Sequence, residues 1–245
     1  MTEGMCDEMV DGKYRGWADR VADTLAKANP NFSYVNLAIR GKLLNQVIDD
    51  QIPAAVPYIS GPETLVSFHA GANDVLRPNY QADVAFAKYE RGISDLAKTG
   101  ATVIVFTVID RVEGNGKTAQ LWHERFSAFN VNVREVANKY GATIIESDDA
   151  KWMADLRFLA KDRLHLNPDG HWRLSQAVLE KLGKDFDANW KTPLEQARKK
   201  SWLRKNSENL IWIITFVIPW IWRRIRGRSS GDGRSAKYET PISWK

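Results

Sequence analysis

The sequence contains a single cysteine, Cys6, among its 245 residues. That count excludes an internal disulfide framework and a cysteine-rich zinc site, and it is typical of a reducing compartment. No unbroken run of about 18 apolar residues is present, so we expect no ordinary membrane-spanning helix. Residues 1–8 lack the apolar core of a signal peptide. These absences together predict a cytoplasmic globular protein.

Charge is unevenly distributed along the chain. The 35 Lys and Arg against 30 Asp and Glu give a net charge of +5. Residues 191–245 contain 13 basic and 4 acidic side chains, or +9, which leaves 22 and 26 in residues 1–190, or −4. This change of composition predicts a boundary at 190/191, between a globular domain and a basic C-terminal tail.

The tail also contains five of the ten tryptophans and an apolar run over residues 210–222. As a helix, this run is about 20 Å long, shorter than the roughly 30 Å hydrocarbon thickness of a bilayer. Three alternatives remain open: the helix packs on the body with its charges in water, it lies on an anionic membrane surface, or it binds a partner. We expect no nucleic-acid partner, and we expect residues 229–235 to form a flexible end.

Helix and strand patterns alternate along the first 190 residues, which predicts a parallel α/β sheet between layers of helices. Apolar residues at helical spacing, and short runs rich in β-branched residues, set the expected elements. Strands are expected at 33–38, 64–68, 102–109 and 142–146, and helices at 14–28, 42–50, 83–98, 119–140 and 168–182.

Polar residues and glycines follow the expected strands, where ligands of open α/β sheets gather. Gly41 follows the first strand, and residues 71–74 (Gly-Ala-Asn-Asp) follow the second. Asp162 lies three residues before His165, so its carboxylate can hydrogen-bond one imidazole nitrogen and leave the other as a base. Each feature alone is more often structural: a turn glycine, an ordinary turn, or a surface ion pair.

The order and spacing of these blocks, together with Thr2-Glu3-Gly4, resemble the SGNH hydrolase (GDSL-type esterase/lipase) family over about residues 1–185. The end of the chain is similar to that of actinobacterial members. The resemblance implies a three-layer α/β/α sandwich with a flavodoxin-like parallel sheet. It implies a serine esterase or lipase that acts by acyl transfer on a small-molecule or lipid ester, without a cofactor.

The resemblance also assigns roles to four residues. His165 is implied as the base, with Asp162 orienting it. The Gly41 backbone N–H and the Asn73 side chain are implied as donors of the oxyanion hole, where losing one donor typically costs about 10²–10³ in kcat. No metal is expected, since no His and carboxylate residues have zincin-like spacing.

The chain departs from the family at the nucleophile. In the family the serine belongs to a Gly-Asp-Ser-x-Thr-x-Gly block, and Met1 occupies the x position, so the serine falls immediately before it. The strand that delivers the serine is also absent; it is expected between strands 33–38 and 64–68. Unsatisfied buried backbone groups cost about 1–3 kcal/mol each, against a total stability of about 5–15 kcal/mol.

We therefore expect an N-terminally truncated sequence whose full product is an esterase, and an inactive chain as given. Two alternatives stay open. The chain is a pseudoenzyme that binds an acylated ligand or a membrane surface, or another residue, with Cys6 and Thr2 nearest in sequence, acts as nucleophile. Of the other histidines, we expect His171 on a helix surface and His69 in packing contacts.

Overall fold

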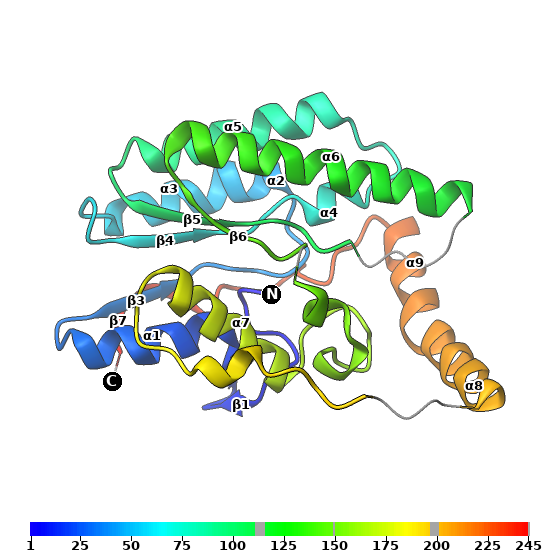
Figure 1. Ribbon diagram of the computed structural model, residues 1–245. Helices are drawn as coiled ribbons and strands as arrows, with labels where there is room; N and C mark the ends of the chain where they lie inside the picture. Colours follow the sequence, from blue (N-terminus) through cyan, green and yellow to red (C-terminus); the bar gives the residue numbers. More distant parts are fainter. Residues whose placement is uncertain (111–115, 149, 197–200, 245) are drawn as a thin grey trace.

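The computed structural model describes residues 1–110, 116–148, 150–196 and 201–244. At its centre is a parallel sheet in the order β4-β5-β6 (Figure 1). Its strands are β4 (Leu65–Phe68), β5 (Thr102–Phe106) and β6 (Thr143–Ile145). Leu65 lies opposite Thr102, and Ile104 opposite Thr143. Consecutive strands are therefore neighbours, as the alternating pattern predicts.

Helices cover both faces of this sheet and make it the middle of three layers (Figure 1). Val103 and Val105 of β5 face one apolar core, and Ile104 and Phe106 face the other. This division follows from the two-residue period of a strand. The first core is covered by α2 (Leu44–Gln46), the π-helical segment η1 (Val47–Gln51), α3 (Ile52–Ala55), α5 (Ala82–Ala97) and α6 (Lys117–Tyr140). The second is covered by α1 (Gly16–Ala28) and α7 (Pro168–Lys181).

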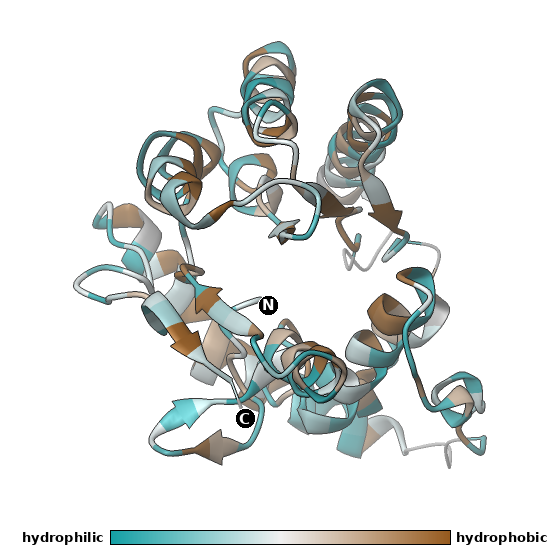
Figure 2. Ribbon diagram, turned by 90° about the vertical axis from the view of Figure 1, so that its left-hand side faces the viewer, coloured by the Kyte–Doolittle hydropathy of each residue, from teal (hydrophilic) through white to brown (hydrophobic). Residues whose placement is uncertain are grey.

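The remaining elements are short. Strands β1 (Met9–Val10) and β2 (Lys13–Tyr14) form a hairpin before α1, and α4 (Ala72–Val75) follows β4. Single 3₁₀ turns are η2 (Val56–Tyr58), η3 (Lys151–Ala154), η4 (Leu156–Phe158) and η5 (Ala188–Lys191). In the hydropathy view, hydrophobic colour concentrates on the strands and on the inner faces of the helices (Figure 2).

Local sequence accounts for several element ends. The Asn167 side chain accepts a hydrogen bond from the Gly170 N–H (2.9 Å), with Pro168 as the first helical residue, so α7 begins where the capping pattern predicts. Gly141 closes α6 in a left-handed conformation (φ 70°). The strand expected at 102–109 ends earlier, at Phe106. Just beyond it, the Ser147 backbone N–H donates to the Thr107 hydroxyl (2.7 Å) and not to a backbone carbonyl, so the ladder between the two strands stops there.

The C-terminal segment returns to the body. A helix runs from Trp202 to Ile225 as α8 (Trp202–Trp212), a π-helical turn η6 (Ile213–Val217) and α9 (Ile218–Ile225). It includes the predicted 210–222 run. No helix in the described part of the chain combines the length and apolarity needed to cross a membrane.

The expectation of a flexible end at residues 229–235 is wrong. The Ser229 hydroxyl donates to the Gly41 carbonyl (3.2 Å). Beyond this turn, β7 (Tyr238–Ser243) pairs antiparallel with β3 (Ser33–Asn36). The Lys237 ammonium also contacts the Asp19 carboxylate at 2.6 Å, with both side chains 4% exposed. The strand pairing and this buried ion pair hold the turn against the body, which its polar composition alone could not reveal.

Candidate active site

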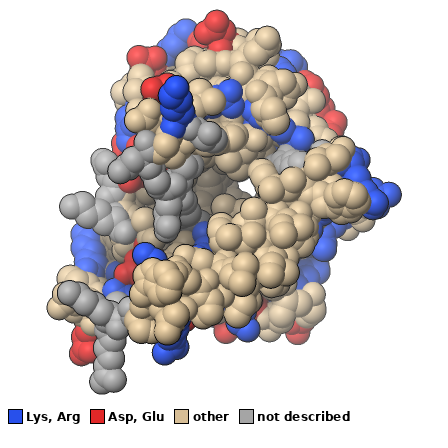
Figure 3. Space-filling view, turned by 90° about the vertical axis from the view of Figure 1, so that its right-hand side faces the viewer, with Lys and Arg blue, Asp and Glu red and all other residues tan. Residues whose placement is uncertain are grey.

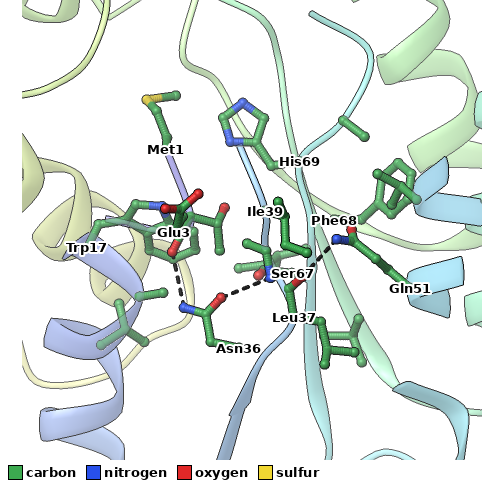
Figure 4. A pocket seen from close by; sticks show the side chains of 18 of the residues that line it. Met1, Glu3, Trp17, Asn36, Leu37, Ile39, Gln51, Ser67, Phe68 and His69 are labelled. Carbon is green, nitrogen blue, oxygen red and sulfur yellow. Dashed lines mark hydrogen bonds between the residues drawn. The ribbon is translucent and has the colours of Figure 1, made fainter. Parts of the chain in front are cut away.

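A cavity of about 1850 Å³ separates β3 from β4. Among the described residues, β3 pairs only with β7, and β4 only with β5, so each strand presents its other edge to this cavity. Figure 4 shows Met1 and His69 reaching into it, with Asn36 and Ser67 on its floor. The Trp17 indole N–H, which also borders the cavity, is buried and has no hydrogen-bond partner in the described structure.

The four residues implied by the resemblance all line this one cavity: Gly41, Asn73, Asp162 and His165. Strands β3 and β4 end on the same side of the molecule (Figure 1), so the loops that follow them meet there. The loop that precedes α7 reaches the same end and brings Asp162 and His165. The structure therefore brings together residues that are more than 120 positions apart in the sequence.

Asp162 and His165 form a directly bonded pair. Nδ1 of His165 lies 2.6 Å from Oδ2 of Asp162, while Oδ1 accepts the backbone N–H groups of Leu164 (2.9 Å) and His165 (3.0 Å). Arg163 adopts a left-handed conformation (φ 56°) to make this tight turn. Burial raises the pKa of Asp162, but the hydrogen bonds from His165 outweigh it, so the net pKa lies below its usual value.

The ionised Asp162 carboxylate fixes the tautomer of His165. The carboxylate accepts the Nδ1–H, which leaves the lone pair on Nε2. No described residue donates a hydrogen bond to Nε2. The His165 side chain is 22% exposed on the cavity side. Nε2 is therefore the atom of this pair that is available to take a proton.

Asn73, in the short helix α4, is bonded to the loop that contains Gly41. The Asn73 side-chain amide donates to the Lys42 carbonyl (3.0 Å), and Asp74 accepts the Leu44 N–H (3.0 Å). One of the two amide hydrogens of Asn73 satisfies this contact, and the second is available to a ligand. Gly41 itself is in the left-handed region (φ 76°), and a Cβ there would collide with the Ser229 hydroxyl.

Sequence reasoning did not foresee that the C-terminal helix contacts this site. The Trp212 indole N–H donates to the Asp162 carbonyl (2.8 Å). The Arg163 guanidinium lies over the Trp212 ring at 5.0 Å and bonds the Asn209 side chain at 2.7 Å. The two segments are about fifty residues apart, and no local pattern signals such a contact. The helix thus packs against the loop that holds the Asp162–His165 pair.

Cys6 also reaches the pair. Its sulfur and one ligand atom each of Asp162 and His165 lie within 4.8 Å of one another, and these are described side chains close enough to hold a metal ion. Burial, and then the negative charge of Asp162, raise the pKa of Cys6 to about 11. The thiol is therefore protonated near neutral pH, which opposes both nucleophilic attack and metal ligation, since each needs the thiolate.

His171 is not on a helix surface, as expected from the sequence, but fully buried. Its Nδ1 accepts the Trp17 backbone N–H (3.2 Å) and its Nε2 bonds the Met5 carbonyl (3.1 Å), so it ties the N-terminal loop to α7. His69 packs as expected, stacked on Phe106 with ring centroids 4.8 Å apart, and it also borders the cavity. Burial lowers the pKa of His171 to about 4 and that of His69 to about 3.

These two neutral histidines predict a loss of stability in mild acid. An unfolded histidine titrates near 6.5, so between pH 6.5 and about 4 the unfolded chain binds more protons at His171 than the folded one. The free energy of unfolding therefore falls as the pH falls, by about 2 kcal/mol from His171 between pH 7 and pH 5. Urea unfolding at the two pH values measures this. In His171→Gln the drop should shrink by that amount, and an unchanged drop would contradict the assignment.

The three layers, the parallel sheet and the loops at one end of it define a mixed α/β fold of the SGNH hydrolase type. The chain belongs to the GDSL-like lipase/acylhydrolase family, whose model matches residues 1–173. At the level of the family, it is an ester hydrolase. No curated protein matches the chain.

Solved structures share this fold at low sequence identity. The acetylxylan esterase Axe2 from Geobacillus stearothermophilus is 16% identical with a TM-score of 0.57, over 76% of this chain and 93% of that one. LAE5, an α/β hydrolase enzyme from the metagenome of Lake Arreo, Spain, is 21% identical with a TM-score of 0.55, over 74% of this chain and 88% of that one.

Proposed function

We propose that the protein hydrolyses carboxylic esters through a serine nucleophile, with His165 as the base. The observation that carries this proposal is that the directly bonded Asp162–His165 pair borders the same cavity as Asn73 and Gly41. A carboxylate-oriented imidazole and two hydrogen-bond donors facing one space are what acyl transfer requires. The proposal rests on these residues occurring together, and no single one of them would support it.

The proposed reaction has two halves. Nε2 of His165 takes the proton of the serine hydroxyl as the oxygen attacks the ester carbonyl, and the Asn73 side chain and Gly41 N–H stabilise the oxyanion. The imidazolium then gives its proton to the departing alcohol, which leaves an acyl-serine. Water, deprotonated by His165, attacks that acyl group, and the second tetrahedral intermediate releases the carboxylic acid and the serine.

We propose that the serine lies on an extended segment that ends directly before Met1 and fills the cavity. The volume of about 1850 Å³ exceeds the roughly 300–1000 Å³ of ordinary ligand pockets. Both β3 and β4 present a strand edge to it, and a strand placed between them, about 4.8 Å from each, would pair with both edges. Met1 borders the same cavity as His165 and Asn73, so a serine placed directly before it would enter the space that these residues line.

Since the structural neighbour Axe2 is an acetylxylan esterase, we propose small acyl esters such as acetyl esters as the first class to assay. The competing function is a protein without hydrolytic activity that binds an acylated ligand in the same cavity. The two differ in whether a serine stands within reach of Nε2 of His165.

Mass spectrometry of the N-terminal peptide, on protein isolated from the cells that make it, tests where the serine comes from. A peptide that continues upstream through Gly-Asp-Ser is the expected result. A peptide that begins at Met1 or Thr2 would overturn the proposal and favour the binding function.

Activity provides the second test. We expect an extension of five β-branched or apolar residues followed by Gly-Asp-Ser, placed before Met1, to produce p-nitrophenyl acetate hydrolysis that the chain from Met1 lacks. The matched control ends in Gly-Asp-Ala. It should gain the same thermal stability, because its strand pairs with both edges, yet show no turnover. Equal activity in both forms would refute the serine, and no gain of stability in either would refute the strand.

A further inference from the structure

The helix formed by α8, η6 and α9 has two different apolar faces. The inner face carries Trp212, Phe216, Val217 and Trp220, which border the central cavity. The outer face carries large apolar side chains at helical spacing that point into solvent. Its members are Leu210 (59% exposed), Ile211 (64%), Ile214 (56%), Ile218 (54%), Ile221 (44%), Trp222 (54%) and Ile225 (72%).

Such a surface is unusual for a soluble body. Single exposed apolar residues are normal, but a contiguous stripe over four helical turns marks an interaction site. No described segment of the chain covers it, since the contacts of this helix with the body use Asn209, Trp212 and other inner residues. The outer face is therefore open to a partner outside this body.

Charge identifies the chemistry of that partner. Residues 202–228 contain six basic side chains and one acidic, Glu208, whose charge is compensated by Arg204 at 3.1 Å. Arg223, Arg226 and Arg228 follow the apolar stripe and are exposed; Arg223 and Arg228 also border the cavity, whereas Arg226 does not. In Figure 3, uncharged residues dominate the ridge on this side of the molecule, with Lys and Arg side chains along its margins. A partner with a negative surface and an apolar interior fits both features.

We propose that the outer face of α8–α9 docks on an anionic lipid bilayer and lies in the plane of its interface. The apolar stripe would enter the boundary between headgroups and acyl chains, and the cations near the surface would add electrostatic attraction to the anionic lipids. Trp222 and Arg226, stacked at 4.5 Å, have the amphipathic character of interfacial anchors. Because the opposite face of the same helix holds the Asp162 loop, docking brings the cavity that contains His165 next to the membrane.

Vesicle co-sedimentation tests this docking without measuring ester hydrolysis. Its result therefore does not depend on the proposed serine. The full chain is mixed with vesicles of phosphatidylcholine containing about 30% phosphatidylglycerol, or of phosphatidylcholine alone. We expect sedimentation with the anionic vesicles and at least tenfold weaker binding to the neutral ones. Raising the salt from 0.05 to 0.5 M should weaken the anionic binding severalfold, because it shortens the screening length.

Point variants are preferable to removal of the tail, which would also delete β7 from the sheet. The double variant Ile214→Ser with Ile218→Ser should reduce binding to anionic vesicles at least tenfold. Arg226→Gln, next to Trp222 on the outer face, should reduce it severalfold and lessen its salt dependence. The matched control is Val131→Ser, which changes an equally exposed apolar residue on α6 and should leave binding unchanged.

Three results would overturn the proposal. One is sedimentation with anionic vesicles no greater than without vesicles. Another is an equal loss of binding in the Val131→Ser control. The third is a dimer in solution, measured by light scattering, that the Ile214→Ser, Ile218→Ser variant converts to monomer, since the outer face would then be an interface between two copies of this chain.

Discussion

Replacing His165 by alanine, in the chain extended by Gly-Asp-Ser, is expected to lower kcat for p-nitrophenyl acetate by about 10⁶-fold. The imidazole has two tasks in the proposed reaction, since Nε2 takes the proton of the attacking serine and later protonates the leaving group. No other described histidine that borders the cavity is bonded to a carboxylate. The loss should therefore be in kcat, with little change in KM.

The control for this variant is His123→Ala. His123 lies on α6 and is paired with Asp110, so the variant removes another carboxylate-paired imidazole without touching the proposed machinery. We expect its kcat to match that of the parent chain. Activity retained in His165→Ala would show that another group acts as the base, and thermal unfolding at the parental temperature would show that a lost activity is not a lost fold.

Asn73→Ala is expected to lower kcat by about 10²- to 10³-fold, because one donor to the developing oxyanion disappears. KM should change little, since the donor bonds the transition state more strongly than the ground-state carbonyl. The variant also loses the hydrogen bond to the Lys42 carbonyl, which costs about 1 kcal/mol of stability. Measuring kcat, KM and the midpoint of thermal unfolding together separates the two effects.

Asn138→Ala is the matched control, because Asn138 is an exposed asparagine on α6 far along the chain from the site. Its kinetics should be those of the parent. A loss in Asn73→Ala that appears in KM alone would mean that Asn73 binds substrate without stabilising the transition state. An unchanged kcat would remove Asn73 from the oxyanion hole.

The elements of the body were predictable because their signals are local. Apolar residues at helical spacing placed α1, α5 and α7, and runs of β-branched residues placed β4 and β5. The Asp162–His165 contact was also predictable, since three residues of chain limit how far apart the two side chains can lie. That all four implied residues border one cavity followed from the rule that loops meet at the carboxyl ends of parallel strands.

Contacts between distant segments were not predictable in the same way. Composition marked residues 229–235 as flexible, but the pairing of β7 with β3 and the Lys237–Asp19 contact hold this turn against Gly41. His171 carries a polar side chain on a helix whose other face is exposed, so its burial depends on the backbone groups of Met5 and Trp17, which only the fold brings to it. No pattern along the chain encodes a hydrogen bond that joins residues more than 150 positions apart.

The sequence by itself predicted the α/β class from local patterns, and its motifs carried the family resemblance that implies the candidate base and donors. The tertiary structure decided where the C-terminal segment goes. Trp212 meets Asp162, Ser229 meets Gly41 and β7 completes the edge of β3, so a basic, apolar tail becomes a wall of the site with its other face in solvent. The physical reason is that an apolar run specifies only that it must be covered, whereas the surface that covers each face depends on the packing of the whole chain.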